Sequence, residues 1–572
     1  MRIYQLEIKN FRGIQDSILN FISPLVCLVG LGDSTKSTIL DAIEYVLSPN
    51  WFLPIDDSDF TNCNISEDKS IKITTTIGPI PEALKSESKY GLYLRGWNSK
   101  TNELHDEPRE EDICVLSVRL TIDSSLTPEW TVITDRHLEG FHISYRDRQL
   151  IGISRIGNNI DNELAWTRGS SLLRLSKNKK EIEKVLLEAN RQLRTLNITQ
   201  AAFAKLVESI QKAKIGGKVY GINTDNLKPN VDPKNTRGNS SVISLHDGDV
   251  PFRRMGLGSR RLMSIGLQLE CIKEGDILLI DEIEQALEPH RLKHLLRTLT
   301  KNMKEVNYGQ VFMTTHSPVT LEELGADPLY CVHYSNIDRK TEIEKVGSDI
   351  QGTVRRTPEA FFSPKVIVCE GSTEIGLLRA FERKEIDRHD NVYSFAYNKV
   401  VIVDGEGTSA SQRAYDLAKY RYKTCLFVDS DRLGEWKIKE GEIQKKGVEI
   451  IRWQNSNNTE MQLFFEIPQK YIRNIIQIVI DENNKDTQSI LDSLNSDLSS
   501  HLETLEAIDN YADQELLRQI IAKSASKNTW FKNIAVAEKL GDYLFGEIFD
   551  SIKDTQFYQG FRSIQAWARD GK

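Results

Sequence analysis

The chain is 572 residues long and carries a formal net charge of −8, with 39% hydrophobic and 27% charged residues. This length exceeds what one hydrophobic core supports, so we expect two to four domains. No apolar run is long enough to span a membrane, which argues against a membrane protein. The seven cysteines form no CxxC pair, which argues against a disulfide framework and a zinc ribbon. We therefore expect a cytoplasmic protein.

The first thirty residues alternate as strands, and the last strand, at 25–29, runs into a loop rich in glycine, serine and threonine. A helical pattern follows over 39–47. Strand, glycine loop and helix form the setting of a P-loop, in which Lys36 reaches the β- and γ-phosphates of ATP and Ser37 binds Mg²⁺. The predicted ATP-binding residues are Gly30, Gly32, Asp33, Ser34, Thr35, Lys36, Ser37 and Thr38.

One position departs from the P-loop motif, because Thr35 stands where the pattern has glycine before the lysine. A β-branched residue strains a backbone conformation that suits glycine. We therefore expect slow hydrolysis or a site that mainly binds ATP. A polar turn with a chance lysine is the alternative on this motif alone.

The middle of the chain is predicted to be β-rich and then helical. Strands are expected at 71–77, 115–122 and 130–135, with a loop over 91–111. Two amphipathic helices are expected within 176–213, where they either close the core or form a dimer surface.

A buried parallel strand at 276–280 ends in Asp281 and Glu282, at the edge where α/β sheets bind ligands. A Gly-x-Gly-Ser stretch with Gly258 and Ser259 opens a helix before it, and a strand at 311–315 ends in His316. With the P-loop, these elements resemble the ATP-binding-cassette ATPases of the SMC and RecF kind. The resemblance implies that Asp281 holds Mg²⁺ through water, Glu282 orients the attacking water, His316 senses the γ-phosphate, and the glycine-serine signature binds the nucleotide of a second copy.

A second α/β pattern starts near residue 364. A strand at 365–369 ends in Glu370, and a strand at 425–428 ends in Asp429 and Asp431. Carboxylates at neighbouring strand ends form an oxygen-only site that suits Mg²⁺ or Mn²⁺. Glu374 and Glu460 join by position, and five carboxylates favour two metal ions about 4 Å apart. This arrangement resembles a Toprim domain.

An ABC-type ATPase followed by a Toprim domain resembles the OLD (overcoming lysogenization defect) family, which includes the nuclease of the Gabija antiphage system. The resemblance implies metal-dependent DNA cleavage, homodimerisation through the ATPase insertion, and a defence role, alone or beside a helicase or a reverse transcriptase with its small DNA. It also implies a catalytic lysine after the acids, for which Lys532 is the first candidate and Lys527 the second.

The predicted fold class is α/β: an ABC/SMC-like ATPase domain with a helical dimerisation insertion, a Toprim domain and a helical C-terminal region. We expect boundaries at 1–165 and 241–362 for the two parts of the ATPase, 166–240 for the insertion, 363–475 for the Toprim domain and 476–572 for the helical region.

The leading functional hypothesis is an ATP-regulated, divalent-metal-dependent DNA endonuclease or nickase. Its rival is an ATP-dependent nucleic-acid sensor or clamp that regulates a partner without cutting DNA. A topoisomerase would need a tyrosine-bearing winged helix, and a bacterial primase would need a zinc ribbon. The sequence does not decide which DNA is cut, or whether ATP activates or inhibits cutting.

Overall fold

The computed structural model describes residues 1–66, 69–156, 160–167, 170–176, 184, 207–222, 224–231, 243–305, 309–498 and 500–570. The chain divides into two compact units, Met1–Val346 and Gly347–Lys572. Most of the helical stretch predicted at 176–213, on which the predicted dimer surface lies, falls outside the described residues. Across the described ranges, no helix is long and apolar enough to cross a bilayer.

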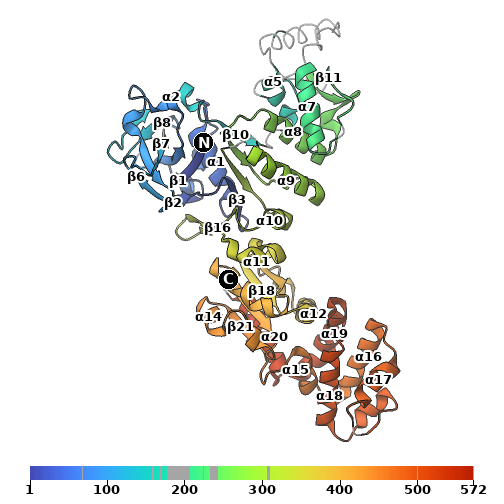
Figure 1. The fold of residues 1–572 in the computed structure, drawn as a ribbon. Helices are drawn as coiled ribbons and strands as arrows, with labels where there is room; N and C mark the ends of the chain where they lie inside the picture. The colour runs from blue at the N-terminus through green and yellow to red at the C-terminus, as the bar shows by residue number, and fades with distance from the viewer. Residues whose placement is uncertain are drawn as a thin grey trace. The chain divides into compact units, whose positions relative to one another are not determined.

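The N-terminal unit begins with an antiparallel sheet (Figure 1). Alternating burial along its strands places one face on a core of isoleucine, leucine and valine side chains. The stretch 91–111, predicted as a loop, contains two short strands, so that prediction was wrong. The spatial order is β2 (Ile14–Asn20), β1 (Arg2–Phe11), β4 (Ile71–Gly78), β7 (Ile113–Ile122), β5 (Arg95–Asn98) and β6 (Glu103–His105), with β8 (Pro128–Ile133) and β9 (Phe141–His142) continuing from β7.

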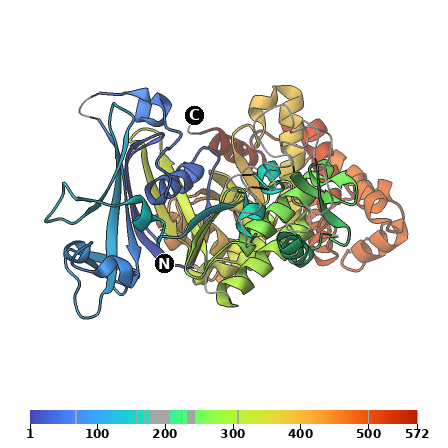
Figure 2. The same cartoon turned by 90° about the horizontal axis from the view of Figure 1, so that it is seen from above.

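A second, mostly parallel sheet follows, and the helix α1 (Lys36–Leu47) packs between the two sheets, as Figure 2 shows from above. The acidic strand β14 has four buried residues in a row, as predicted for a strand covered on both faces. Because β3, β14 and β15 are parallel, their carboxyl ends meet at one edge. The order is β10 (Ile153–Ile156), β14 (Ile277–Ile280), β15 (Gln310–Thr314), β3 (Leu25–Val29), β16 (Leu329–Ser335) and antiparallel β17 (Lys340–Lys345).

Between β10 and β14 the chain forms a smaller body around Trp166, Phe252 and Met263. It contains α4 (Ile160–Glu163), α5 (Ser171–Arg174), α7 (Val207–Val219), α8 (Leu257–Glu270) and a three-stranded sheet of β11 (Leu227–Val231), β12 (Ile243–Asp247) and β13 (Val250–Pro251). Two further helices, α9 (Pro289–Glu305) and α10 (Pro318–Leu324), follow β14 and β15 respectively.

The C-terminal unit is built on a four-stranded parallel sheet in the order β19 (Val400–Asp404), β18 (Lys365–Cys369), β20 (Lys423–Val428) and β21 (Glu449–Arg452). The first connection leads from β18 to one side and the next crosses to the other side, so the order reverses between β18 and β20. Ligands bind in such a crevice at the carboxyl ends of the strands. Glu370 and Asp429 follow these two neighbouring strands directly.

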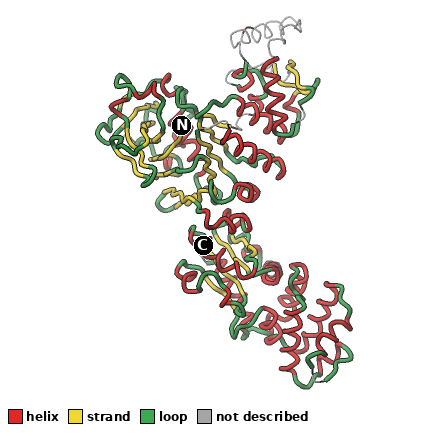
Figure 3. The backbone as a smooth tube through the Cα atoms, viewed as in Figure 1, coloured by secondary structure: helices red, strands yellow, loops and turns green. Residues whose placement is uncertain are grey.

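Helices dominate the rest of this unit, as predicted for the region after 475 (Figure 3). They bury an aromatic core that includes Phe381, Phe427, Trp453 and Phe561. The α/β fold class is confirmed. The helices are α12 (Ser372–Arg388), α13 (Ala410–Lys419), α14 (Glu440–Lys445), α15 (Thr459–Glu466), α16 (Ile472–Asn483), α17 (Thr487–Asn495), α18 (Gln514–Lys527), α19 (Ile534–Tyr543) and α20 (Gln556–Arg569).

Candidate functional site

The P-loop connects β3 to α1, and its lysine folds back onto the loop. Lys36 Nζ donates to Gly30 O at 3.1 Å, to Leu31 O at 2.6 Å and to Ser34 Oγ at 3.1 Å. Burial lowers the pKa of Lys36 to about 8, although the charge of Asp281 opposes the shift. A buried ammonium held by loop oxygens at a helix N-terminus is arranged to receive phosphate oxygens.

Thr35 adopts the left-handed conformation that the motif assigns to glycine, with φ of 65° and ψ of 12°. Its hydroxyl donates to Ser34 O at 2.6 Å and lies 2.8 Å from Thr341 Oγ1. Gly30 has φ of +151°, and a Cβ there would lie 2.7 Å from Val332 O. The strain expected at Thr35 is therefore present, and hydrogen bonds to neighbouring oxygens hold it in place.

Asp281 lies opposite the P-loop serine. Ser37 Oγ donates to Asp281 Oδ1 at 3.1 Å, and Thr314 Oγ1 donates to the same oxygen at 2.5 Å. The other oxygen, Oδ2, accepts from Arg155 Nη2 at 2.9 Å. The structure thus brings together the serine and the aspartate that were predicted to hold the Mg²⁺ of a nucleotide.

Glu282 and His316 follow neighbouring parallel strands, so they lie at the same edge. Glu282 has φ of +45°, and its N–H donates to Thr314 Oγ1 at 2.8 Å. The backbone N–H of His316 donates to Glu284 Oε1 at 2.6 Å. Burial lowers the pKa of His316, and the charge of Lys36 lowers it further. A neutral imidazole near the lysine suits a contact with phosphate oxygen.

Gly258 and Ser259 lie in the first turn of α8, in contact with the chain that follows the acidic strand. A Cβ on Gly258 would lie 2.5 Å from Ala286 O, and Arg291 Nη1 donates to Ser259 Oγ at 3.2 Å. Arg261, one turn further along, donates to Asp281 O at 3.0 Å and to Glu282 O at 2.8 Å. The signature helix is therefore tied to the backbone of the acidic strand.

In the C-terminal unit, five carboxylates surround the crevice between β18 and β20, and we call them the acid cluster: Glu370, Glu374, Asp429, Asp431 and Glu460. Asp429 N donates to Glu370 Oε2 at 2.9 Å. Thr459 Oγ1 lies 2.8 Å from both Asp429 Oδ1 and Glu374 Oε1. Glu370 therefore lies against Asp429, as a shared site requires.

Burial and mutual repulsion disfavour ionisation of four members of the acid cluster, Glu370, Glu374, Asp429 and Glu460. Burial raises the pKa of Glu374 from 4.5 to about 7, with Glu460 and Glu370 adding to the shift. Burial also raises the pKa of Asp429 well above its usual value, and neighbouring Glu374 and Glu370 raise it further. The pKa values of Glu370 and Glu460 are raised mainly by burial, and the charge of Asp431 contributes to both shifts.

Lys532 faces the acid cluster from the segment between α18 and α19. Thr373, next to Glu374, donates to Phe531 O at 3.1 Å, which pins this segment beside the acids. The charges of Glu460, Glu374, Asp429 and Glu370 raise the pKa of Lys532 against the effect of burial. Lys527 ends α18. Of the two predicted lysines, Lys532 is the one whose charge acts on the acids.

The donor set of the acid cluster fits an oxygen-preferring cation. Glu460 is 2% exposed, and its Oε1 is buried with no hydrogen-bond partner among the described residues. Within those ranges, no group of three or more acidic, histidine or cysteine side chains is arranged to hold a metal ion as it stands. The carboxylate oxygens of the acid cluster are of the kind that Mg²⁺ and Mn²⁺ prefer. Their side chains would have to rotate to surround an ion.

Three residues that contact the sites were not predicted from the sequence. Arg155 and Arg261 bind the acidic strand, and Thr459 joins two members of the acid cluster. An isolated arginine or threonine carries no motif. Asn458 caps the start of α15 and Thr459 is the first residue of that helix, so the sequence marks the helix start but not the role of Thr459.

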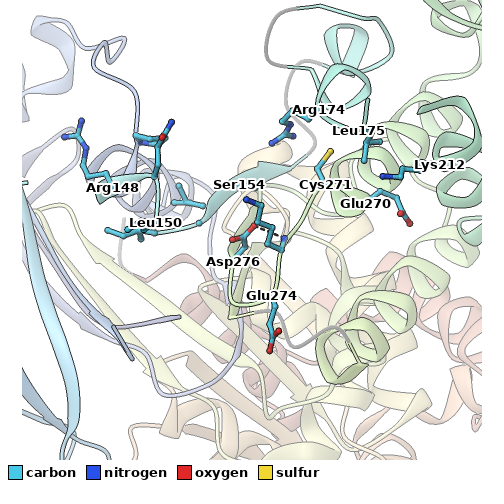
Figure 4. Close-up of a pocket in the computed structure, with 16 residues that line it drawn as sticks. Arg148, Leu150, Ser154, Arg174, Leu175, Lys212, Glu270, Cys271, Glu274 and Asp276 are labelled. Atoms are coloured by element: carbon cyan, nitrogen blue, oxygen red, sulfur yellow. Dashed lines mark hydrogen bonds between the residues drawn. The ribbon is translucent and has the colours of Figure 1, made fainter. Parts of the chain in front are cut away.

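A cavity of about 770 Å³ in the N-terminal unit is lined by residues of neither candidate site (Figure 4). Its lining includes Ser154 of β10 and Asp276, which precedes β14, whereas the P-loop lies at the opposite, carboxyl ends of the parallel strands. Arg174, Lys212 and Cys271 line it from the helical body. It belongs to neither candidate site.

Comparison with known proteins matches two family models to the N-terminal unit. “AAA ATPase domain” matches residues 1–122, and “AAA domain, putative AbiEii toxin, Type IV TA system” matches residues 135–322. The matched ranges include the P-loop, the acidic strand and His316. The N-terminal unit therefore carries an ATPase domain, which implies ATP binding.

Two solved structures of SMC heads align with the chain at low TM-scores. The Smc head domain from Pyrococcus furiosus bound to the C-terminal domain of ScpA has 13% identity and a TM-score of 0.38, covering 61% of this chain and 96% of that one. The SMC head domain from Thermotoga maritima has 15% identity and a TM-score of 0.33, covering 61% and 100%.

A curated relative extends the similarity beyond the ATPase. The OLD nuclease of Thermus scotoductus is 23% identical over 423 residues, which cover 67% of this chain and 74% of the relative. That share of the chain exceeds the 346 residues of the N-terminal unit, so the alignment reaches into the C-terminal unit. Together with the two matched ATPase domains, this similarity supports the predicted resemblance to ATPase nucleases of the OLD family.

Proposed function

We propose that the protein is an ATP-regulated, divalent-metal-dependent DNA endonuclease or nickase that acts in antiphage defence, with a Toprim-type site in its C-terminal unit. The observation that carries the proposal is the acid cluster, in which carboxylates from several elements, three of them buried, face Lys532. Buried acids without cations are unfavourable, so their retention supports a site for metal ions. Similarity to the OLD nuclease of Thermus scotoductus supports the nuclease assignment.

Each residue of the acid cluster has a proposed task. Glu370, Asp429 and Asp431, with Glu374 and Glu460, would hold one or two Mg²⁺ or Mn²⁺ ions, which would supply Lewis acidity and charge neutralisation at a scissile phosphate. Thr459 keeps Asp429 and Glu374 oriented through its hydroxyl. Lys532 would neutralise charge that develops on the phosphate oxygens.

The ATP site is proposed to control access to the acid cluster. Lys36, Ser37 and Asp281 would bind Mg²⁺–ATP, Glu282 would orient the attacking water, and His316 would contact the γ-phosphate. Gly258 and Ser259 would bind the nucleotide of a second copy, which makes the active species a homodimer or a larger oligomer.

Cleavage of plasmid DNA in the presence of Mn²⁺ tests the nuclease assignment. Wild type should nick or linearise the plasmid, and Asp429→Ala should not, because the variant removes a carboxylate that accepts from Thr459 and lies close enough to Glu374 and Glu370 for their charges to raise its pKa. Circular dichroism should show that both proteins are folded. Equal cleavage by the two proteins would sink the assignment.

The second candidate function is an ATP-dependent nucleic-acid sensor or clamp that regulates a partner without cutting. The ATPase domain alone favours it. It predicts that Lys36→Ala abolishes protection of cells against phage while Asp431→Ala has no effect. The nuclease proposal predicts that both variants lose protection.

A further inference from the structure

The strand β10 carries a buried arginine that joins two parts of the ATP site. Arg155 is 9% exposed in its side chain. Its Nη1 donates to Asp41 Oδ1 at 2.6 Å and to Glu44 Oε2 at 3.2 Å, and both of these acids lie on α1. Its Nη2 donates to Asp281 Oδ2 at 2.9 Å. One guanidinium therefore bridges the P-loop helix and the end of the acidic strand.

The contacts of Asp281 divide between its two oxygens. Oδ2 accepts from Arg155, whereas Oδ1 accepts from Ser37 and Thr314. The guanidinium is planar and its other amino group is bound to Asp41 and Glu44, so the N–H that reaches Oδ2 has a fixed direction and limits the rotation of the carboxylate. Arg155 thus keeps Oδ1 directed at the P-loop serine.

We propose that Arg155 is a positioning residue of the ATP site that sets the affinity for the nucleotide-bound Mg²⁺. It holds Asp281 in the orientation in which Oδ1 and Ser37 Oγ together can receive the cation. The inference depends on the proposed use of Ser37 and Asp281 in Mg²⁺–ATP binding. It assigns to a residue outside the P-loop and the acidic strand the task of preparing that pair.

The contacts of Lys36 are separate from this arrangement. Lys36 donates to Gly30, Leu31 and Ser34, all of them in the loop itself. Loss of Arg155 should therefore leave the phosphate cradle intact and weaken the contribution of the cation alone. A general loss of stability would instead weaken nucleotide binding with and without Mg²⁺.

Arg12 provides a matched control. It donates to Asp59 Oδ1 at 2.7 Å and forms a close ion pair with Asp41, the acid that Arg155 also binds. Besides Asp41, Arg155 binds Asp281 and Glu44, whereas Arg12 binds Asp59. Arg12→Gln and Arg155→Gln both leave Asp41 with one arginine, and they differ in whether Asp281 loses its guanidinium.

The experiment measures binding of a fluorescent ATP analogue to the full chain, with Mg²⁺ titrated from zero, and the thermal unfolding midpoint of each variant. Arg155→Gln should raise the Mg²⁺ concentration at half-effect by about ten-fold or more, as loss of a residue that orients a metal ligand typically does. Binding without Mg²⁺ should stay within about two-fold of wild type. Arg12→Gln should keep the wild-type Mg²⁺ dependence.

Arg155→Lys covers the case in which Arg155→Gln does not fold. An ammonium is a point donor that does not reproduce the fork, so this variant should show a Mg²⁺ dependence between those of wild type and the glutamine variant. If wild type does not bind nucleotide, the ATP site and this inference both fail. If wild type shows Mg²⁺-dependent binding and the folded Arg155 variants match it, this inference alone is overturned.

Discussion

The two candidate sites use acidic residues at the carboxyl ends of parallel strands, but they balance the charge differently. In the N-terminal unit, the Asp281 carboxylate accepts a hydrogen bond from the Arg155 guanidinium, and Arg261 donates to the backbone oxygen of Asp281. In the C-terminal unit, the acid cluster has Lys532 for a cation, and the buried Glu460 Oε1 has no partner among the described residues.

This difference indicates what each site needs. In a site with built-in arginines and a phosphate loop, the protein's own cations balance the acids before a nucleotide and its Mg²⁺ bind. In a cluster of carboxyl groups whose pKa values are raised, the ionised form is stable only when cations neutralise the charge. The comparison predicts opposite responses of the two units to metal ions, pH and loss of single acids.

The largest effect is expected at Lys532. Lys532→Ala should lower the rate of DNA cleavage by about a hundred- to a thousand-fold, the usual cost of removing one group that stabilises developing charge. Lys527→Ala is the matched control, and the rate of Mn²⁺-dependent plasmid nicking should remain within a few-fold of wild type. A larger loss for Lys527→Ala would exchange the roles of the two lysines.

The pH dependence of stability should reveal the uncompensated acids. Glu374 has a pKa of about 7 in the folded state and an ordinary value of 4.5. The folded protein therefore binds more protons than the unfolded protein between these values, and metal-free protein should lose stability as the pH rises through this window, by at most about 3 kcal/mol.

Chemical denaturation in EDTA and in Mn²⁺ measures this effect. Metal binding needs deprotonated carboxylates, so the stabilisation by Mn²⁺ should grow over the same pH range. A metal-free unfolding midpoint that rises with pH from 4.5 to 7 would contradict the uncompensated state of the acid cluster.

Single asparagine substitutions should act in opposite directions in the two units. Asp429→Asn removes a charge that its neighbours repel, so the metal-free protein should gain about 1 kcal/mol or more in its free energy of unfolding. Asp281→Asn removes the charge of one of the three carboxylates that bind the buried Arg155 guanidinium and should cost about 1 kcal/mol or more. Denaturation midpoints in EDTA compare them, and a loss of stability in both would remove the distinction.

The smallest effect is expected at Thr35. Thr35→Ala keeps the left-handed backbone cost, about 1–2 kcal/mol, and loses the hydroxyl contacts with Ser34 and Thr341. Thr35→Gly loses the same contacts but relieves the backbone. The glycine variant should therefore be more stable than the alanine variant by about 1 kcal/mol, as measured by thermal unfolding. If the alanine variant were the more stable one, the backbone at Thr35 would not be strained.

The sequence predicts the parts of both sites that follow buried strands. Continuous apolar runs identify β14, β18 and β20, and the acids directly after them are found because strand ends in a parallel sheet share one edge. The short strands β5 and β6 were missed because polar residues and turns surround them.

Residues that act through distant partners are not predictable in this way. Arg155 binds Asp41 and Asp281, which are 114 and 126 residues away in the chain. Thr459 lies 30 residues from Asp429 and 85 from Glu374. Their partners are set by the order of strands in the sheets, and a single sequence carries no local pattern for that order.

A crystal structure of the protein soaked with Mn²⁺, with the ion located by its anomalous scattering, tests most directly whether the acid cluster binds divalent metal ions. We expect one or two Mn²⁺ ions bound by Glu370 and Asp429. A second ion should lie about 4 Å from the first. A soaked crystal in which Mn²⁺ occupies other sites, but not these carboxylates, would contradict the proposal of a metal-dependent nuclease.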